Sequence, residues 1–466
     1  MDYQSFIARM AQLKDDGGFA PLVMPDHLFD FQQYLVDFAL RSGRSAIFAD
    51  CGMGKTAMEL AWAENVFRKT GKPVLILTPL AVGAQFVTEA ERFGHDAAQS
   101  RDGSIKSEIV IANYEILHHF DSSKFGGVVC DESSILKSFD GSTKAAVTEF
   151  MRLVPYRLLG TATAAPNDFV ELGTSSEALG NMGHIDMLSR FFSNKENTVN
   201  SRGSRVTRTG DDSFTRDKMR IKPHAEEHFW RWIASWSRAI RSPADYGFDA
   251  SRYVMPKLIQ REHVAKGRKT RSGMLFALEA HGLGEEREEN RITLTERCEK
   301  AAEVLADADS AVAWCNLNDE SALLTSLIDG AVELTGSDSL DKKEEILSAY
   351  AKGEIRVLVT KPKIASFGLN WQHAHRMTYF PTHSYEQMYQ AIRRMWRFGQ
   401  KNDVVVDFIV TEGIKNTMHN LQRKAAQADE MFSKIVQFST NALKVEKKDI
   451  YTNNMEMPQW ALPTKK

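Results

Sequence analysis

The segment Ser45-Ala-Ile-Phe-Ala49, followed by Asp50-Cys-Gly-Met-Gly-Lys-Thr56, decides the fold of the first half of this chain. Its first five residues predict a short buried strand, and the amphipathic stretch after Thr56 predicts a helix. Gly52 and Gly54 let the backbone between them turn tightly. A strand, a glycine loop and a helix in this order place backbone N–H groups around an anion at a helix N-terminus. The segment therefore predicts a phosphate-binding loop.

The loop departs from the strict G-x-x-x-x-G-K-[ST] pattern, because Ala49 stands where the first glycine would be. The rest of the pattern remains. Lys55 is expected to bridge the β- and γ-phosphates of a nucleotide, and the Thr56 hydroxyl to bind Mg²⁺. ATP and Mg²⁺ are therefore the predicted ligands, and the phosphates are expected to lie against the backbone of Gly52, Met53 and Gly54.

An acidic pair follows a second apolar segment. Asp131 and Glu132 come directly after Gly127-Val-Val-Cys130. In a doubly wound sheet the carboxyl ends of neighbouring strands meet at one edge, so this pair is expected beside the glycine loop. Asp131 is expected to hold Mg²⁺, and Glu132 to orient and deprotonate the attacking water.

Short apolar segments alternate with amphipathic stretches in both halves of the chain. This rhythm predicts an α/β protein with two parallel, doubly wound sheets. Beyond the segments quoted above, the predicted strands are 74–77, 108–112, 157–160, 257–265, 311–315, 331–334, 356–360, 376–380 and 404–410.

The segment Gln390-Ala-Ile-Arg-Arg-Met-Trp-Arg-Phe-Gly-Gln400 supplies the second cluster of charge. With a helix predicted over 384–397, Arg394 and Arg397 lie three residues apart on one helix face. A planar guanidinium suits a phosphoryl transition state whose charge is spread over several oxygens. The two arginines are therefore expected to reach the γ-phosphate from the second half of the chain. The alternative is a solvated basic face, since Arg393 lies beside them.

Composition bounds the remaining choices. The 466 residues carry a formal net charge of -2, so any polynucleotide site must be a local basic surface. The four cysteines lack C-x-x-C spacing, which fits a reducing cytoplasm. No segment has the length and apolarity of a signal peptide core or a membrane span. We therefore expect a cytoplasmic protein without a membrane partner.

The rhythm of strands and helices weakens between 171 and 250. Residues 201–222 are rich in arginine and lysine and are expected to form a basic loop, either as a solvated insertion or as a contact to nucleic acid. An aromatic-rich helix over 228–236 follows. Its stripe of tryptophans is expected to pack in the core rather than to stack on bases.

Taken together, these segments resemble superfamily 2 helicases, and among them the Swi/Snf-like (chromatin-remodeller-like) DNA translocases of the compact phage or bacterial type. The resemblance covers roughly residues 25–425. Its most specific part is the pattern Q-A-x-x-R-x-x-R-x-G-Q at 390–400. The motifs that carry it are Phe31-Gln32, Gly52–Thr56, Leu77-Thr-Pro79, Asn113-Tyr-Glu115, Asp131–Ser134, Gly160-Thr-Ala-Thr163, Leu334-Thr-Gly336, Gly368-Leu-Asn370 and Gln390–Gln400.

The resemblance implies two tandem RecA-like lobes that close on one ATP. It implies adenine recognition by Gln32 and nucleotide contacts at Gly368 and Gln390. It also implies largely sequence-independent phosphate contacts to DNA, duplex being favoured. The residues at the matching positions are Thr78, Pro79, Asn113, Thr161, Thr163, Thr360, Lys361, Asn370 and Trp371.

The predicted division of the chain is an extension at 1–22, a first lobe at 23–170, a helical insertion with a basic loop at 171–250, a second lobe at 251–425, and a C-terminal helix and tail at 426–466.

Two departures from the family pattern concern the coupling of ATP hydrolysis to movement. Ser134 stands where the family has histidine, and Ala365-Ser-Phe367 replaces a glycine pair.

The expected function is ATP-dependent movement along DNA in replication, recombination or repair, in a bacterial or phage-infected cell. The first alternative is a strand-separating helicase acting on single-stranded DNA or RNA. A second is an ATP-gated DNA-binding clamp, and a third is the motor subunit of a restriction or defence complex. The possible partners are accordingly a nuclease or a replication or recombination protein.

Overall fold

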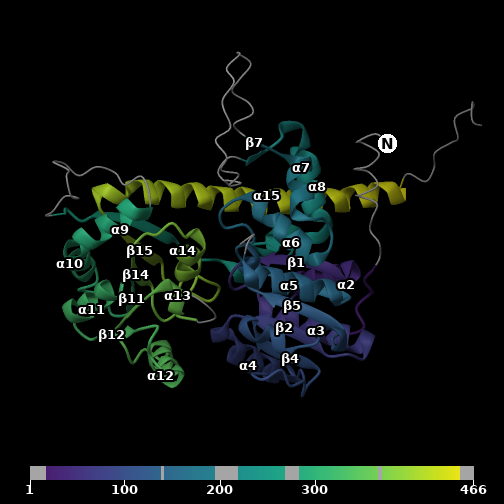
Figure 1. The fold of residues 1–466 in the computed structure, drawn as a ribbon, viewed down its shortest axis with the longest axis horizontal. Coiled ribbons are helices and arrows are strands. Elements are labelled where there is room, and N and C mark those ends of the chain that lie inside the picture. The colour runs from purple at the N-terminus through teal and green to yellow at the C-terminus, as the bar shows by residue number, and fades with distance from the viewer. Residues whose placement is uncertain (1–16, 138–140, 195–218, 268–282, 366–369, 452–466) are drawn as a thin grey trace, which may run out of the picture.

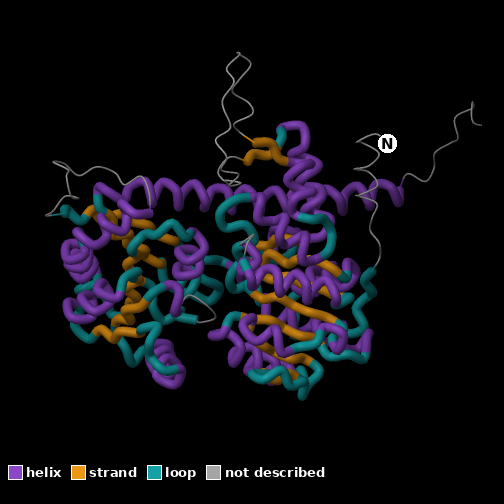
Figure 2. The backbone as a smooth tube through the Cα atoms, viewed as in Figure 1, coloured by secondary structure: helices purple, strands orange, loops and turns teal. Residues whose placement is uncertain are grey.

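Two parallel β-sheets, each covered by helices, form two lobes that lie side by side (Figure 1). The computed structural model describes residues 17–137, 141–194, 219–267, 283–365 and 370–451. Within these residues strands and helices alternate along most of both lobes (Figure 2). The predicted fold class, two tandem RecA-like α/β lobes, is confirmed.

The first sheet has seven parallel strands in the order β3-β4-β2-β5-β6-β1-β9. The strands are β1 (Arg44–Ala49), β2 (Val74–Thr78), β3 (Ala97–Gln99), β4 (Ile109–Asn113), β5 (Gly127–Asp131), β6 (Tyr156–Gly160) and β9 (Ser237–Ile240). The helices around it are α2 (Asp30–Ser42), α3 (Lys55–Thr70), α4 (Gly83–Phe93), α5 (Ser142–Leu153), α6 (Leu172–Leu179), α7 (His184–Phe191) and α8 (Glu226–Trp236).

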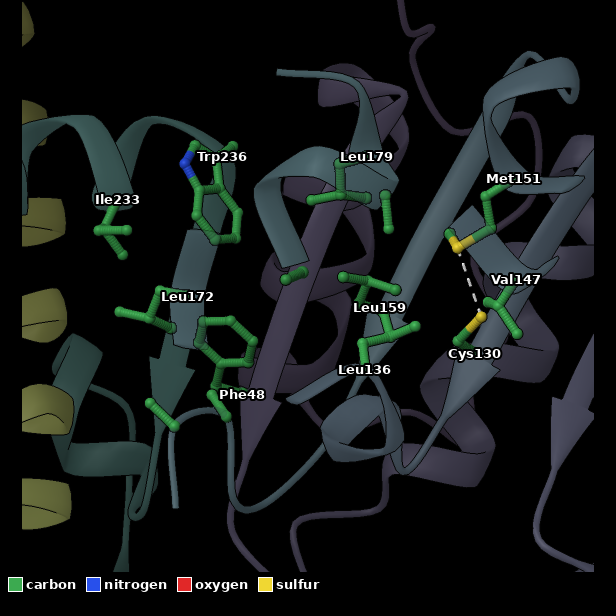
Figure 3. Close-up of a cluster of buried hydrophobic side chains, with 14 of the residues drawn as sticks. Phe48, Cys130, Leu136, Val147, Met151, Leu159, Leu172, Leu179, Ile233 and Trp236 are labelled. Atoms are coloured by element: carbon green, nitrogen blue, oxygen red, sulfur yellow. Dashed lines mark hydrogen bonds between the residues drawn. The ribbon is translucent and has the colours of Figure 1, made fainter. Parts of the chain in front are cut away.

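Strand β1 faces a hydrophobic core on each side, because successive side chains of a strand point to opposite faces of the sheet. Ala46 and Phe48 lie in one core and Ile47 and Ala49 in the other. Figure 3 shows part of the first core, where Phe48 lies near Leu172, with Ile233 and Trp236 of α8 above it. With both faces covered, the strand holds the start of the glycine loop firmly.

The predicted insertion at 171–250 is integrated into the first lobe. Strand β9 pairs with β1 and extends the sheet, and helices α6, α7 and α8 bury apolar side chains in the first core. Of the predicted stripe of Trp232 and Trp236, Trp236 is buried and Trp232 is half-buried against the same core, which confirms that the stripe packs in the core. Most of the predicted basic loop at 201–222 lies outside the described residues.

The second sheet has six parallel strands in the order β10-β15-β14-β11-β13-β12. Its strands are β10 (Leu258–Val264), β11 (Ala311–Trp314), β12 (Ala331–Leu334), β13 (Val357–Thr360), β14 (Arg376–Tyr379) and β15 (Val404–Val410). Its helices are α9 (Leu283–Ile292), α10 (Leu294–Val304), α11 (Asn318–Leu327), α12 (Leu340–Ala351), α13 (Pro362–Ala365) and α14 (Tyr385–Ile392). A separate hairpin pairs β7 (Phe192–Asn194) with β8 (Met219–Ile221).

One long helix, α15 (Lys415–Tyr451), crosses both lobes (Figure 1). Its first part packs in the core of the second lobe through Met418 and Leu421, and its middle packs in the core of the first lobe through Phe432 and Ile435. The predicted boundary at 425/426 therefore cuts a continuous helix. Among the described residues, no helix combines the length and apolarity needed to cross a membrane.

Candidate functional site

The glycine loop between β1 and α3 has the conformation that only glycine adopts readily. Gly52 and Gly54 have φ angles of 89° and 79°, in the left-handed region. A Cβ at Gly54 would lie 2.2 Å from the Gln32 amide nitrogen, so a larger residue there would also displace the Gln32 side chain. Gly54 is the N-cap of α3, so the loop presents the first N–H groups of a 16-residue helix. This end of the helix suits phosphate.

Lys55, Asp131 and Glu132 meet at the carboxyl ends of β1 and β5. Lys55 Nζ lies 2.8 Å from Glu132 Oε1 and 4.0 Å from Asp131 Oδ1. Burial by itself lowers the pKa of Lys55, but the two carboxylates outweigh it and raise that pKa. Burial raises the pKa of Asp131. The geometry thus joins the three residues that the sequence placed at the phosphates and the metal.

The backbone of Glu132 is held in an unusual conformation. Its φ of 52° is the one positive value at a non-glycine residue in the described part of the chain. Strain of this kind persists where the surrounding structure enforces it. The side chain is bound on both oxygens, since Oε1 faces Lys55 and Oε2 accepts a hydrogen bond of 3.2 Å from Thr161 Oγ1. The strained turn therefore aims the carboxylate at the loop and ties it to the segment after β6.

The donors near the loop fit a magnesium ion. Asp131 is buried, and burial opposes the ionised form of its carboxyl group. A cation close to this carboxyl group would stabilise the ionised form. Thr56 lies in the first turn of α3 beside Lys55 and supplies a hydroxyl. One carboxylate and one hydroxyl, together with phosphate oxygens, are the hard oxygen donors that Mg²⁺ prefers.

A further carboxyl group, missed by sequence reasoning, lies behind this cluster. Glu59 on α3 is 2% exposed, and in the described structure neither carboxyl oxygen has a hydrogen-bond partner. Burial raises its pKa well above the ordinary value, and Asp131 adds to the shift. Its spacing of four residues from Lys55 places both on one face of α3, which is the signal that sequence reasoning overlooked.

Replacing Glu59 by glutamine is expected to raise the free energy of unfolding at pH 8 and to leave it nearly unchanged at pH 5. Between the unfolded pKa and the raised folded pKa, the folded state holds a proton that the unfolded state has lost. Wild-type stability therefore falls as pH rises through this window, by up to about 1.4 kcal/mol per pH unit, whereas glutamine does not titrate. Urea unfolding of both proteins at the two pH values measures the difference. The exposed Glu91→Gln is the control, and an equal gain at both pH values contradicts the account.

Gln32 is bound at both ends within the chain. Its Nε2 donates to the Met53 carbonyl at 2.9 Å, and its Oε1 accepts from the Phe29 N–H at 2.9 Å. The side chain therefore fastens the start of α2 to the glycine loop. Reading an adenine with this amide requires exchanging one of these bonds for a bond to the base.

The arginine segment approaches the loop from the second lobe. A Cβ at Gly52 would lie 3.2 Å from Phe398, so Phe398 packs directly against the glycine loop. Arg394 is buried, and its pKa is lowered by that burial and raised by Cys51, Glu132 and Asp131, which places it in the field of the acidic pair. Burial also lowers the pKa of Arg397, whereas the interaction with Cys51 acts to raise it.

The prediction that Arg394 and Arg397 lie on a helix is wrong. Helix α14 ends at Ile392, and both arginines lie in the turn that follows. In this turn two backbone hydrogen bonds span three residues instead of four: the Arg394 N–H donates to the Ala391 carbonyl at 3.3 Å, and the Met395 N–H to the Ile392 carbonyl at 3.2 Å. Bonds of this type tighten the end of a helix.

Asp50, Tyr389 and Arg393 form a contact between the lobes that the sequence did not reveal. Asp50 Oδ1 accepts hydrogen bonds from the Cys51 N–H at 2.6 Å and from the Tyr389 hydroxyl, and Oδ2 pairs with Arg393 Nη2. Asp50 precedes the glycine loop, so the contact joins the root of the loop to α14. Arg393, which the sequence left as part of a solvated basic face, is 9% exposed.

Ser134 also contacts the second lobe. Its hydroxyl donates to the Glu386 carboxylate on α14, and Lys137 pairs with the same carboxylate. Ser134 stands where the resemblance called for histidine, so this contact gives the acidic segment its own connection to the second lobe.

The predicted nucleic-acid contacts divide by exposure. Thr78, Thr360 and Trp371 have no exposed surface. The two threonine hydroxyls donate to carbonyls of the chain, and Trp371 stacks on Trp314 with ring centroids 5.6 Å apart. Each of these three side chains is part of a core, so a contact to DNA from these positions would have to come from the backbone, and it stays a prediction.

The other predicted contacts differ in their surroundings. Thr161 and Thr163 are buried in the segment after β6, and Asn113 is buried with its side-chain oxygen unpartnered in the described structure. Asn370 is exposed, Pro79 is half-buried, and Lys361 is half-buried and bonded to Asn318. Gln390 is buried, and its amide has no hydrogen-bond partner among the described residues. Gly368 lies outside the described residues.

Comparison with known proteins gives limited similarity. No family model matches the chain. Over 168 residues it is 29% identical to putative protein p41 of Acyrthosiphon pisum secondary endosymbiont phage 1, a match that covers 30% of this chain and 36% of that protein. The chain thus spans about a third of the length of this relative.

Among solved structures, the chain is similar to the Sulfolobus solfataricus SWI2/SNF2 ATPase core in complex with dsDNA. The TM-score is 0.41 and the sequence identity 16%, with 93% of this chain and 98% of that chain covered.

Proposed function

We propose that this chain hydrolyses ATP between its two lobes and uses the cycle to move along duplex DNA. The observation that carries the ATPase proposal is the meeting of Lys55, Asp131 and Glu132 beside a glycine loop, with the arginine segment of the second lobe packed on that loop. This combination is what phosphoryl transfer requires: a cradle for phosphates, a base, and cations that stabilise developing charge.

The Lys55–Glu132 pair suggests how the site is prepared for catalysis. While Lys55 is bound to Glu132, its ammonium occupies one oxygen of the carboxylate and Thr161 the other, so neither faces a water. A γ-phosphate would draw Lys55 away, leaving Glu132 held by Thr161 and available to take a proton from water. Mg²⁺ at Thr56 and Asp131 would supply charge neutralisation at the phosphate oxygens. Substrate binding would thereby activate the base.

The DNA part of the proposal is supported by the resemblance of Gln390–Gln400 to the Swi/Snf-like pattern. It is also supported by the two-lobe arrangement, in which a closing cycle moves one lobe relative to the other. A cavity of about 330 Å³ lies between the segment 162–166, α14 and α15. Of the predicted DNA contacts, three are not buried: Pro79, Lys361 and Asn370.

Steady-state ATP hydrolysis tests this function. The purified chain is assayed without nucleic acid and with single-stranded DNA, duplex DNA or structured RNA, each at two salt concentrations. Strong stimulation by duplex DNA that weakens with salt is the expected result, since phosphate contacts release counterions. Stimulation by single strands or RNA alone would favour the strand-separating helicase. The absence of any stimulation would favour a DNA-binding clamp or a motor subunit that needs a partner.

A further inference from the structure

We infer that Arg393 is a positioning residue: through its ion pair with Asp50 it holds the turn after α14 on the phosphate loop, so that Arg394 and Arg397 face the phosphates. This inference rests on the proposed ATPase function and adds to it a residue outside the predicted catalytic set.

Asp50 uses its two carboxylate oxygens to bind groups of both lobes. One oxygen caps the loop by accepting the Cys51 N–H at 2.6 Å and also accepts the Tyr389 hydroxyl. The other oxygen pairs with Arg393. Asp50 is 3% exposed. Removing one partner of a buried ion pair leaves the other charge uncompensated, which strongly destabilises the structure. The contact therefore keeps the loop and the turn in a fixed relation.

The guanidinium of Arg393 is fixed within its own turn as well. It lies 5.2 Å from the ring centroid of Tyr389 and 4.3 Å from that of Trp396, and its Nη1 donates to the Trp396 carbonyl at 3.3 Å. Tyr389 precedes and Trp396 follows the Arg394 position. The side chain thus closes the turn that carries Arg394 and leads into Arg397.

The three neighbouring arginines differ in their electrostatic surroundings. Burial lowers the pKa of Arg393, but Tyr389 and Asp50 outweigh it and raise that pKa. Burial is the leading influence at Arg394 and Arg397, and their pKa values are lowered. Arg393 is thus the arginine of the three whose ion pair with Asp50 forms part of the contact between the lobes.

The same face of α14 makes the second contact to the first lobe. Glu386, Tyr389 and Arg393 are spaced by three and four residues, which places them on one side of a helix. Glu386 contacts Ser134 and Lys137 beyond the acidic pair. Helix α14 therefore contacts the first lobe at two points, and the contact made by Arg393 is the one next to the turn that carries Arg394 and Arg397.

A double-mutant cycle tests this role. Arg393→Met keeps an unbranched apolar stem but removes the ion pair, and we expect it to lower kcat about 10²-fold, as small misplacements of groups at a reaction centre do. The KM for ATP is expected to change less than about 3-fold, because ATP is held mainly by the first lobe. Adding Arg393→Met to Arg397→Ala is expected to cause little further loss, since both changes remove the same contribution. Losses that multiply in the double variant would overturn the inference.

Two further variants guard against a general folding defect. Tyr389→Phe removes only the hydroxyl contact to Asp50, and a smaller loss of kcat with unchanged KM is expected. Gln387→Ala, on the same helix but outside this face, is the matched control and is expected to behave as wild type. A kcat unchanged by both Arg393→Met and Tyr389→Phe would overturn the inference.

A distance measurement separates this inference from the proposed function. Labels carried by ketone amino acids at the exposed positions 91 and 344 report the separation of the lobes. Arg393→Met is expected to broaden the distance distribution whether or not the wild type hydrolyses ATP. Wild type without ATPase activity but with this broadening would reject the proposed function alone, whereas an unchanged distribution would reject the positioning pair.

Discussion

Replacing Arg397 by alanine is expected to lower ATP turnover on the order of 10³-fold or more while ATP still binds. The arginine lies in the turn after α14 and belongs to the second lobe, so it contributes little to the phosphate cradle of the first lobe. Its guanidinium would act mainly when charge spreads over the transferring phosphoryl group. Single-turnover hydrolysis and the binding of a fluorescent ATP analogue measure the two effects separately.

The matched control is Arg423→Ala, which removes an exposed arginine of the second-lobe part of α15 and should leave turnover unchanged. Arg397→Lys should recover only part of the activity, because an ammonium lacks the planar fork of donors. Normal turnover in Arg397→Ala would contradict closure of the two lobes on one ATP.

Replacing Lys55 by alanine is expected to abolish hydrolysis and to weaken nucleotide binding. Lys55 lies at the first position of α3, within 2.8 Å of Glu132, and is the cation of the glycine loop. Its loss would leave Asp131 and Glu132 without their compensating cation, and would remove the ligand of the β- and γ-phosphates. Turnover at saturating ATP and the affinity for the analogue are the measurements.

Lys69→Ala is the control, since this exposed lysine lies at the other end of the same helix. It should change neither quantity. Residual turnover in Lys55→Ala above a few per cent of wild type would mean that the loop is not the phosphate site.

Local sequence patterns were sufficient to predict much of the fold. The strand β1, the glycine loop and α3 follow from hydrophobic periodicity and from two glycines whose φ angles are positive. The contact of Lys55 with Glu132 follows from the rule that carboxyl ends of parallel strands meet at one edge. These predictions needed no knowledge of distant packing.

Features that depend on distant packing were missed. Strand β9, Ser237-Arg-Ala-Ile240, is short, carries two polar residues and follows an aromatic helix directly, so only its pairing with β1 makes it a strand. The turn after α14 is fixed by distant residues, because the Arg394 carbonyl accepts the Trp371 N–H and the Met395 carbonyl accepts a hydrogen bond from Gln400 Nε2.

Burial separates residues that share a motif. Thr360 and Asn370 were both predicted to touch DNA, but Thr360 ends a central strand and is buried, whereas Asn370 is exposed. The pair of Asp50 and Arg393 joins residues 343 positions apart, so no local pattern could reveal it. Motif matching thus selects segments but does not distinguish the buried side chains in them from the exposed ones.

Displacement of a triplex-forming strand from duplex DNA is the measurement that tests ATP-driven movement most directly. The account predicts that the wild-type chain displaces the third strand when ATP and Mg²⁺ are present, and that Lys55→Ala and Arg397→Ala do not. ATP hydrolysis stimulated by duplex DNA without any displacement by the wild type would contradict movement along DNA.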